Sequence, residues 1–124
     1  MGLNEVKLGL PVPYLPDRLL HTIAGVCKAR EIMESGKLYP SSEALEMGIV
    51  DKILPIENVV EAAVEHAHTL GSLPKVGYKM IKQNRVEVIE EQVMARQDKK
   101  EASFIESWYS DEARRCLKEA MKKF

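Results

Sequence analysis

Residues 41–55 read SSEALEMGIVDKILP, and this stretch carries two structural signals one after the other. Two serines precede Glu43, and serine is a preferred residue at the N-cap of a helix. Gly48 is a residue type at which short helices commonly end. The next six residues, Ile49–Leu54, are rich in aliphatic side chains and are closed by a proline. The stretch therefore predicts a serine-capped short helix followed directly by a brief strand.

The N-terminal residues predict a second strand. Val6, Leu8 and Leu10 alternate with Glu5, Lys7 and Gly9, and a period of two is typical of a half-buried strand. The prolines of PVPYLPD (11–17) deny a sheet its N–H donors, so the strand is expected to stop there.

Helical periodicity accounts for most of the remaining chain. Residues 17–35 predict one helix, or two helices with a bend at Gly25, and Gly36 is placed as its C-cap. Residues 56–70 predict another helix, in which valines and alanines share one face. Residues 74–109 predict one or two long helices, and residues 110–124 a final one. The fold class is therefore mainly α with two short strands.

Such a composition is incomplete by itself. Two strands of about five residues do not form an independently stable sheet. The first strand also lies close to residue 1, as though its neighbours were absent. We therefore expect the chain to be part of a larger α/β domain.

Composition excludes several classes of function. The 124 residues carry a net charge of −1 and 45% hydrophobic residues, which fits one ordinary globular domain and implies neither a nucleic-acid surface nor a membrane span. No secretory pattern opens the sequence, and a cytoplasmic location is predicted, with a mitochondrial or peroxisomal one left open. Cys27 and Cys116 are far apart and form no CxxC pair. We predict reduced, semi-buried thiols and neither a zinc site nor a disulfide.

Three segments together resemble one superfamily. These are GLNEVKLGLPVP (2–13), SSEALEMGIVDKILP (41–55) and SFIESWYSDEARRCLKEAMKKF (103–124). In this order and spacing they resemble the C-terminal half of crotonase (enoyl-CoA hydratase/isomerase) proteins, whose fold is an α/β ββα-spiral. The GLNE form at residues 2–5 is most similar to Δ3,Δ2-enoyl-CoA isomerases. The resemblance implies that residues 1–55 end the core and that residues 56–124 form a helical oligomerisation region.

The resemblance also implies a chemistry. Glu5 matches the carboxylate that takes a proton from one carbon of a fatty acyl-CoA thioester and returns it to another. The CoA thioester is then the substrate, and no further cofactor or metal is expected. Leu10, Pro13 and Tyr14 are plausible walls of the acyl pocket. Without the resemblance, Glu5 and Lys7 would be interpreted as a solvated charge pair.

The segment expected to hold the thioester oxygen is not found in these residues. The family's two oxyanion N–H donors belong to the other half of the fold, so we expect the chain to be inactive alone. Two alternatives stay open, a non-catalytic helical assembly module and one half of a split enzyme. Homo-oligomerisation through trimer-type helical contacts is expected, because the apolar stripes of residues 86–108 and 113–121 exceed what the chain can cover.

Other side chains have ordinary interpretations beside functional ones. Lys122 and Lys123 could meet a CoA phosphate, or could complement the dipole of the last helix together with Lys118. His21 is expected at the edge of the core, and His66 and His68 in solvent. Three glutamates on one expected helix, Glu87, Glu90 and Glu91, are interpreted as surface ion pairs with Arg85, Arg96 and Lys99 and not as a metal site. Three methionines, Met80, Met94 and Met121, are expected in the core.

Overall fold

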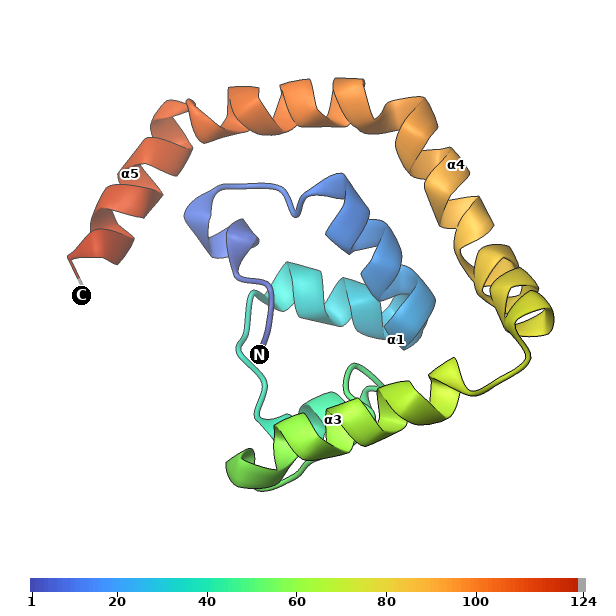
Figure 1. The fold of residues 1–124 in the computed structure, drawn as a ribbon. Helices are drawn as coiled ribbons and strands as arrows, with labels where there is room; N and C mark the ends of the chain where they lie inside the picture. Colours follow the sequence, from blue (N-terminus) through green and yellow to red (C-terminus); the bar gives the residue numbers. More distant parts are fainter. Residues whose placement is uncertain (123–124) are drawn as a thin grey trace.

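The computed structural model describes residues 1–122 and is built from helices (Figure 1). In chain order the elements are η1 (Glu5–Leu8, a 3₁₀ helix), α1 (Tyr14–Ser35), α2 (Ser41–Glu46), α3 (Ile56–Gly71), α4 (Lys75–Trp108) and α5 (Asp111–Met121). η1 and α1 lie in the centre, and α3, α4 and α5 curve around them as an open arc (Figure 1). α1 packs against α4, and η1 packs against both α1 and α5.

Neither predicted strand is present in residues 1–122. Residues 5–8 turn into η1 because local hydrogen bonds take the place of a sheet: Lys7 N donates to Asn4 O at 3.0 Å and Leu10 N to Glu5 O at 3.0 Å. Residues 49–54 form no strand either, and the N–H of Ile49 donates back to Ala44 O at 2.9 Å. Alternation alone does not supply the neighbouring strand that a ladder needs.

The bend predicted within the first long helix is present. Gly25 interrupts α1 with φ 75° and ψ 165°, a conformation that side chains with a Cβ rarely adopt. Gly36 ends α1 in the left-handed region, as expected of a C-cap. The predicted serine cap of the next helix is wrong, because α2 starts at Ser41 with Pro40 as N-cap and no side-chain cap bond.

The buried apolar core is small. It lies where η1, α1 and α5 meet, and it extends to Tyr39 and to Ala44 of α2. Its members are Leu10, Ala29, Ile32, Tyr39, Ala44 and Ala113. α3 and α4 bury no residue at all. The core positions predicted for Met80, Met94 and Met121 are wrong in this chain, because these side chains are 58%, 75% and 75% exposed. The helical stripes are thus present, but most of them face solvent.

Candidate functional site

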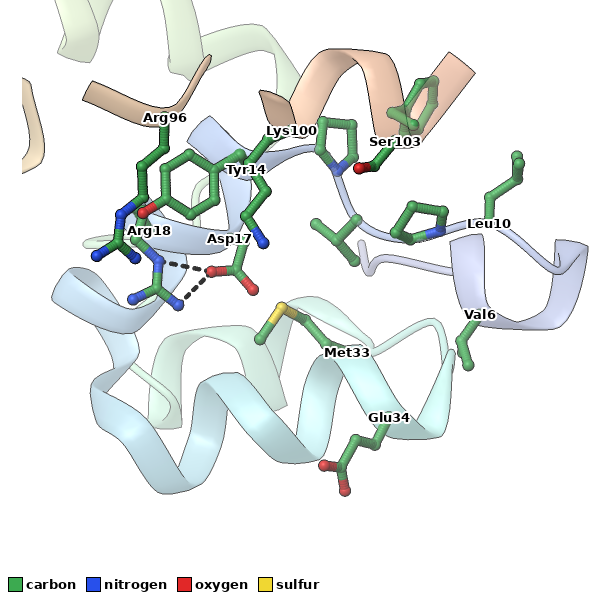
Figure 2. Close-up of a pocket in the computed structure, with 14 residues that line it drawn as sticks. Val6, Leu10, Tyr14, Asp17, Arg18, Met33, Glu34, Arg96, Lys100 and Ser103 are labelled. Atoms are coloured by element: carbon green, nitrogen blue, oxygen red, sulfur yellow. Dashed lines mark hydrogen bonds and ion pairs between the residues drawn. The ribbon is translucent and has the colours of Figure 1, made fainter. Parts of the chain in front are cut away.

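An open pocket of about 570 Å³ lies between η1, the proline segment, α1 and α4 (Figure 2). Its volume falls in the range of about 300–1,000 Å³ that is usual for small-molecule sites. The lining divides into an apolar set (Val6, Leu10, Pro11, Val12, Pro13, Met33, Phe104) and a polar set (Tyr14, Asp17, Arg18, Glu34, Arg96, Lys100, Ser103).

The structure brings the three predicted acyl-pocket residues together. Leu10, Pro13 and Tyr14 all line this pocket. Leu10 is 6% exposed, and its N–H is fixed by the carbonyl of Glu5. Pro13 is the N-cap of α1, with φ −56° and ψ 145°, so the chain turns there and Tyr14 becomes the first helical residue. The prolines that end the predicted strand therefore shape one wall of the pocket.

Glu5 lies beside this pocket but not on its lining. The side chain is half-buried, and its Oε2 is fully buried with no hydrogen-bond partner among the described residues. The charge pair with Lys7, which is the interpretation of Glu5 without the resemblance, is not seen, since no ion pair within residues 1–122 joins the two. A buried carboxylate oxygen without a partner is unfavourable by about 1–3 kcal/mol or more. Buried polar atoms without a partner are rare in native proteins, and a catalytic role is one known reason for such an atom.

The opposite end of the pocket is cationic and centres on an aromatic ring. The guanidinium of Arg18 and the ammonium of Lys100 each lie 5.6 Å from the centroid of the Tyr14 ring, within the range of cation–π attraction. Asp17 accepts a hydrogen bond from Arg18 Nε at 2.7 Å. Arg96 extends toward the same end (Figure 2).

The sequence does not predict the cationic end as part of a site. Arg18, Arg96 and Lys100 come from helices far apart in the chain, and only the packing of α1 on α4 joins them. The usable signal is the four-residue spacing of Arg96 and Lys100, which places both on one face of a helix. Spacing along the chain favours instead the interpretation of Arg96 as a surface partner of the nearby glutamates.

The remaining candidates lie elsewhere. Lys122 is the exposed C-cap residue of α5 and does not line the pocket, and Lys123 lies outside the described residues. His21 sits at the core edge, with Nδ1 2.8 Å from Asp17 O, whereas His66 and His68 are exposed, as expected.

The glutamates and the cysteines form no site either. Within residues 1–122 no group of side chains suits a metal ion, and the predicted ion pairs of Glu87, Glu90 and Glu91 do not form. Both cysteines are free; Cys27 is exposed rather than semi-buried, and Cys116 is partly buried. Among the described helices, none combines the length and apolar character that a membrane crossing needs.

Comparisons with solved structures identify the fold. The crystal structure of human mitochondrial delta3-delta2-enoyl-CoA isomerase superposes with a TM-score of 0.91 and 24% identity, over 99% of this chain and 48% of that one. An enoyl-CoA hydratase/isomerase from Pseudoalteromonas atlantica T6c gives a TM-score of 0.84 and 24% identity, over 96% of this chain and 48% of that one. The helical fold is thus that of the C-terminal part of a crotonase fold.

Sequence comparisons agree. The human protein named enoyl-CoA delta isomerase 1, mitochondrial, is 43% identical over 65 residues, which are 52% of this chain and 21% of that protein. The chain thus spans about half the length of the solved structures and matches about a fifth of the curated relative. The family model described as enoyl-CoA hydratase/isomerase matches residues 1–124. The chain belongs to the enoyl-CoA hydratase/isomerase family.

Proposed function

We propose that this chain supplies the general base of an enoyl-CoA isomerase, with Glu5 as the proton shuttle. The observation that carries the proposal is the buried Oε2 of Glu5, which has no partner among the described residues. The carboxylate would remove a proton from the α-carbon of a 3-enoyl-CoA, leaving an enolate, and would return it to the γ-carbon as the double bond moves into conjugation. One carboxylate suffices because the proton is moved and not consumed.

The fatty acyl chain of the thioester would lie along the apolar lining beside Leu10, Pro13 and Tyr14. Val6 and Leu10 follow Glu5 in the sequence and line the pocket, so the base and the apolar wall share one segment. The CoA thioester is the substrate in this proposal, and no separate cofactor takes part. A contact of Lys122 with a CoA phosphate would have to form away from this pocket, because Lys122 does not line it.

The proposed chemistry also needs donors for the enolate oxygen. Preorganised N–H groups at such an oxygen are each worth about 2.7–4 kcal/mol of transition-state stabilisation. By the family resemblance these donors belong to the other half of the fold, whereas the described residues offer Glu5 and the pocket. We therefore propose that residues 1–124 are inactive alone and act together with the remaining crotonase core, in the same polypeptide or as a split enzyme.

A helical assembly role is a second proposed function, supported by the exposed surface. The accessible surface is 9873 Å², whereas a compact monomer of 14.0 kDa would expose about 6,700 Å². On α3, Ile56 is 88% exposed and Val60 is 72% exposed. On α4, Val76 is 75% exposed and Ile81 is 69% exposed. We propose that residues 56–124 form an oligomerisation region whose apolar faces are covered by further copies or by the rest of the core.

The human relative is named as mitochondrial, and a cytoplasmic location for this chain stays a prediction.

The catalytic part of the proposal is tested by kinetics on a 3-enoyl-CoA with an enzyme that joins residues 1–124 to a crotonase N-terminal half. Glu5→Gln should abolish nearly all turnover, and unchanged turnover would exclude Glu5 as the base.

A further inference from the structure

The pocket has two chemically different ends (Figure 2). Leu10, Val6 and the neighbouring prolines form an apolar end next to η1. Tyr14, Arg18, Arg96 and Lys100 gather at the other end, over the start of α1 and the middle of α4. An elongated ligand that fits such a lining has an aliphatic portion and a group that interacts with cations.

The cationic end carries an excess of positive charge. Two carboxylates line the pocket; Asp17 is held by Arg18 at this end, and its backbone and side chain also face His21. Glu34 lines the pocket from the far part of α1. Within residues 1–122, no carboxylate lies within 4.0 Å of the charged group of Arg96 or Lys100.

The two unneutralised cations are positioned to act together. Arg96 and Lys100 are one turn apart on α4, and four-residue spacing places side chains on the same face. Both line the pocket, and Lys100 is held near the Tyr14 ring at 5.6 Å. A guanidinium offers a planar fork of donors that matches a carboxylate, and an ammonium adds a point charge beside it.

We propose that this end of the pocket binds the carboxylate of an aliphatic ligand whose chain lies against the apolar end. The carboxylate is either that of a free fatty acid or the distal carboxylate of a dicarboxylic acyl thioester. The second source would make the proposed isomerase selective for ω-carboxyacyl substrates. This proposal rests on the acyl pocket of the proposed function, but it does not need Glu5 to act as a base.

The apolar lining distinguishes such a ligand from a phosphate. A phosphate group would use the cationic end alone and leave Val6, Leu10 and Phe104 in contact with water. An aliphatic chain removes that surface from water, which favours binding in proportion to the apolar area that is buried. Affinity should therefore depend on both the chain and the carboxylate.

The single tryptophan provides a reporter for the test. Trp108 stacks on Phe104 with ring centroids 6.3 Å apart, and Phe104 lines the pocket. We would titrate residues 1–124 while recording Trp108 fluorescence and the heat of binding. The probes are octanoate, the mono-thioester of octanedioic acid with N-acetylcysteamine, the octanoyl thioester of N-acetylcysteamine, and CoA alone. The thioesters carry no phosphate, so they separate the distal carboxylate from the CoA moiety.

Two matched double variants identify the residues involved. The test variant Arg96→Gln/Lys100→Gln removes the two pocket cations. The control variant Arg85→Gln/Lys99→Gln removes two exposed cations from the same helix outside the pocket lining. Affinity for octanoate should fall by about tenfold or more in the test variant, since a hydrogen bond to a charged group is worth about 1.5–3 kcal/mol. The control should change affinity by less than about twofold to threefold.

The arms of the experiment give distinct outcomes. Binding of octanoate and of the octanedioic thioester, but not of the octanoyl thioester, supports the proposal and allows both sources. Binding of only one of the two carboxylates supports it and identifies that source. Equal binding of all aliphatic probes, equal loss in both double variants, or binding of CoA alone that depends on Arg96 and Lys100 would overturn it. None of these results depends on turnover, so failure of the Glu5 proposal would remain distinguishable.

Discussion

Met1 and Tyr39 pair through their backbones: Tyr39 N donates to Met1 O at 2.7 Å, and Met1 N donates to Tyr39 O at 2.6 Å. Such an exchange of two hydrogen bonds is the hydrogen-bonded pair of an antiparallel ladder. It brings Gly2 so close to the carbonyl of Lys37 that a Cβ on Gly2 would overlap the oxygen. One backbone pair therefore holds the N-terminus beside residues 37–39, whereas the strand predicted from the alternation of residues 5–10 is absent.

This close approach predicts that Gly2→Ala destabilises the chain. The added methyl group must push the Lys37 carbonyl away, and overpacking of this kind typically costs about 1–3 kcal/mol. The matched control is Gly77→Ala, because Gly77 lies within α4 and a Cβ at that position would meet no atom within 4 Å. Gly77→Ala should raise the free energy of unfolding by about 0.5–1 kcal/mol. Urea unfolding followed by circular dichroism, at one protein concentration, measures both; equal effects would contradict the pairing.

The cap of α5 gives a second stability prediction. Ser110 Oγ accepts a hydrogen bond from Ala113 N at 3.2 Å. Ser110→Ala should therefore lower the free energy of unfolding by about 1 kcal/mol. Ser107→Ala is the control, because Ser107 Oγ only donates to Ser103 O within a helix, and its loss should cost less than about 0.5 kcal/mol. Faster amide hydrogen exchange at Ala113 in the first variant only is the expected local signature.

The exposed faces of α3 and α4 predict self-association. Within residues 1–122 the apolar core has six members, and the accessible surface is 9873 Å². Such a chain should not persist as a compact monomer at tens of micromolar, a concentration range of about 10⁻⁵ M at which moderate interfaces form. Sedimentation velocity should show oligomers, and Val60→Glu with Ile81→Glu should shift the population to smaller, less stable species. A compact monomer without dye-accessible apolar surface would contradict this prediction.

Residues 1–124 alone should not turn over enoyl-CoA substrates. Glu5 can accept a proton, but an enolate without its oxyanion donors stays too high in energy to form at an enzymatic rate. An assay of 3-enoyl-CoA isomerisation and 2-enoyl-CoA hydration with the purified chain should give no signal above buffer. Turnover that disappears in Glu5→Gln would instead mean that the chain contains its own donors.

The helices can be predicted from the sequence because their signals are local. Apolar spacing, Gly25 and Gly36 are sufficient to place α1 and its bend, and Pro55 and Pro74 precede the helices that begin at Ile56 and Lys75. The predicted strands are wrong because a strand depends on a neighbour that no local pattern supplies. Residues 5–8 form η1 instead, in which Val6 is 47% exposed and no residue is buried.

The candidate site is predictable only where the resemblance provides it. Leu10, Pro13 and Tyr14 are expected together, and they do line one pocket. Arg96 and Lys100 escape prediction because they reach that pocket through the packing of α4 on α1, two helices far apart in the chain. Glu5 belongs to η1, which packs against α1 and α5, so its buried Oε2 and its place off the pocket lining also depend on tertiary packing and not on sequence spacing.

The role of Glu5 as the general base is tested most directly by comparing kcat for a 3-enoyl-CoA between wild type and Glu5→Gln. The enzyme used joins residues 1–124 to the other crotonase half. The carboxamide keeps the shape of the side chain but cannot accept a proton, so the loss should fall on the transition state. We predict a fall in kcat of about 10³-fold or more with KM nearly unchanged. Lys7→Ala should change kcat by less than about threefold. A Glu5→Gln enzyme that keeps more than about a tenth of wild-type kcat would contradict the account, because the base would then lie elsewhere.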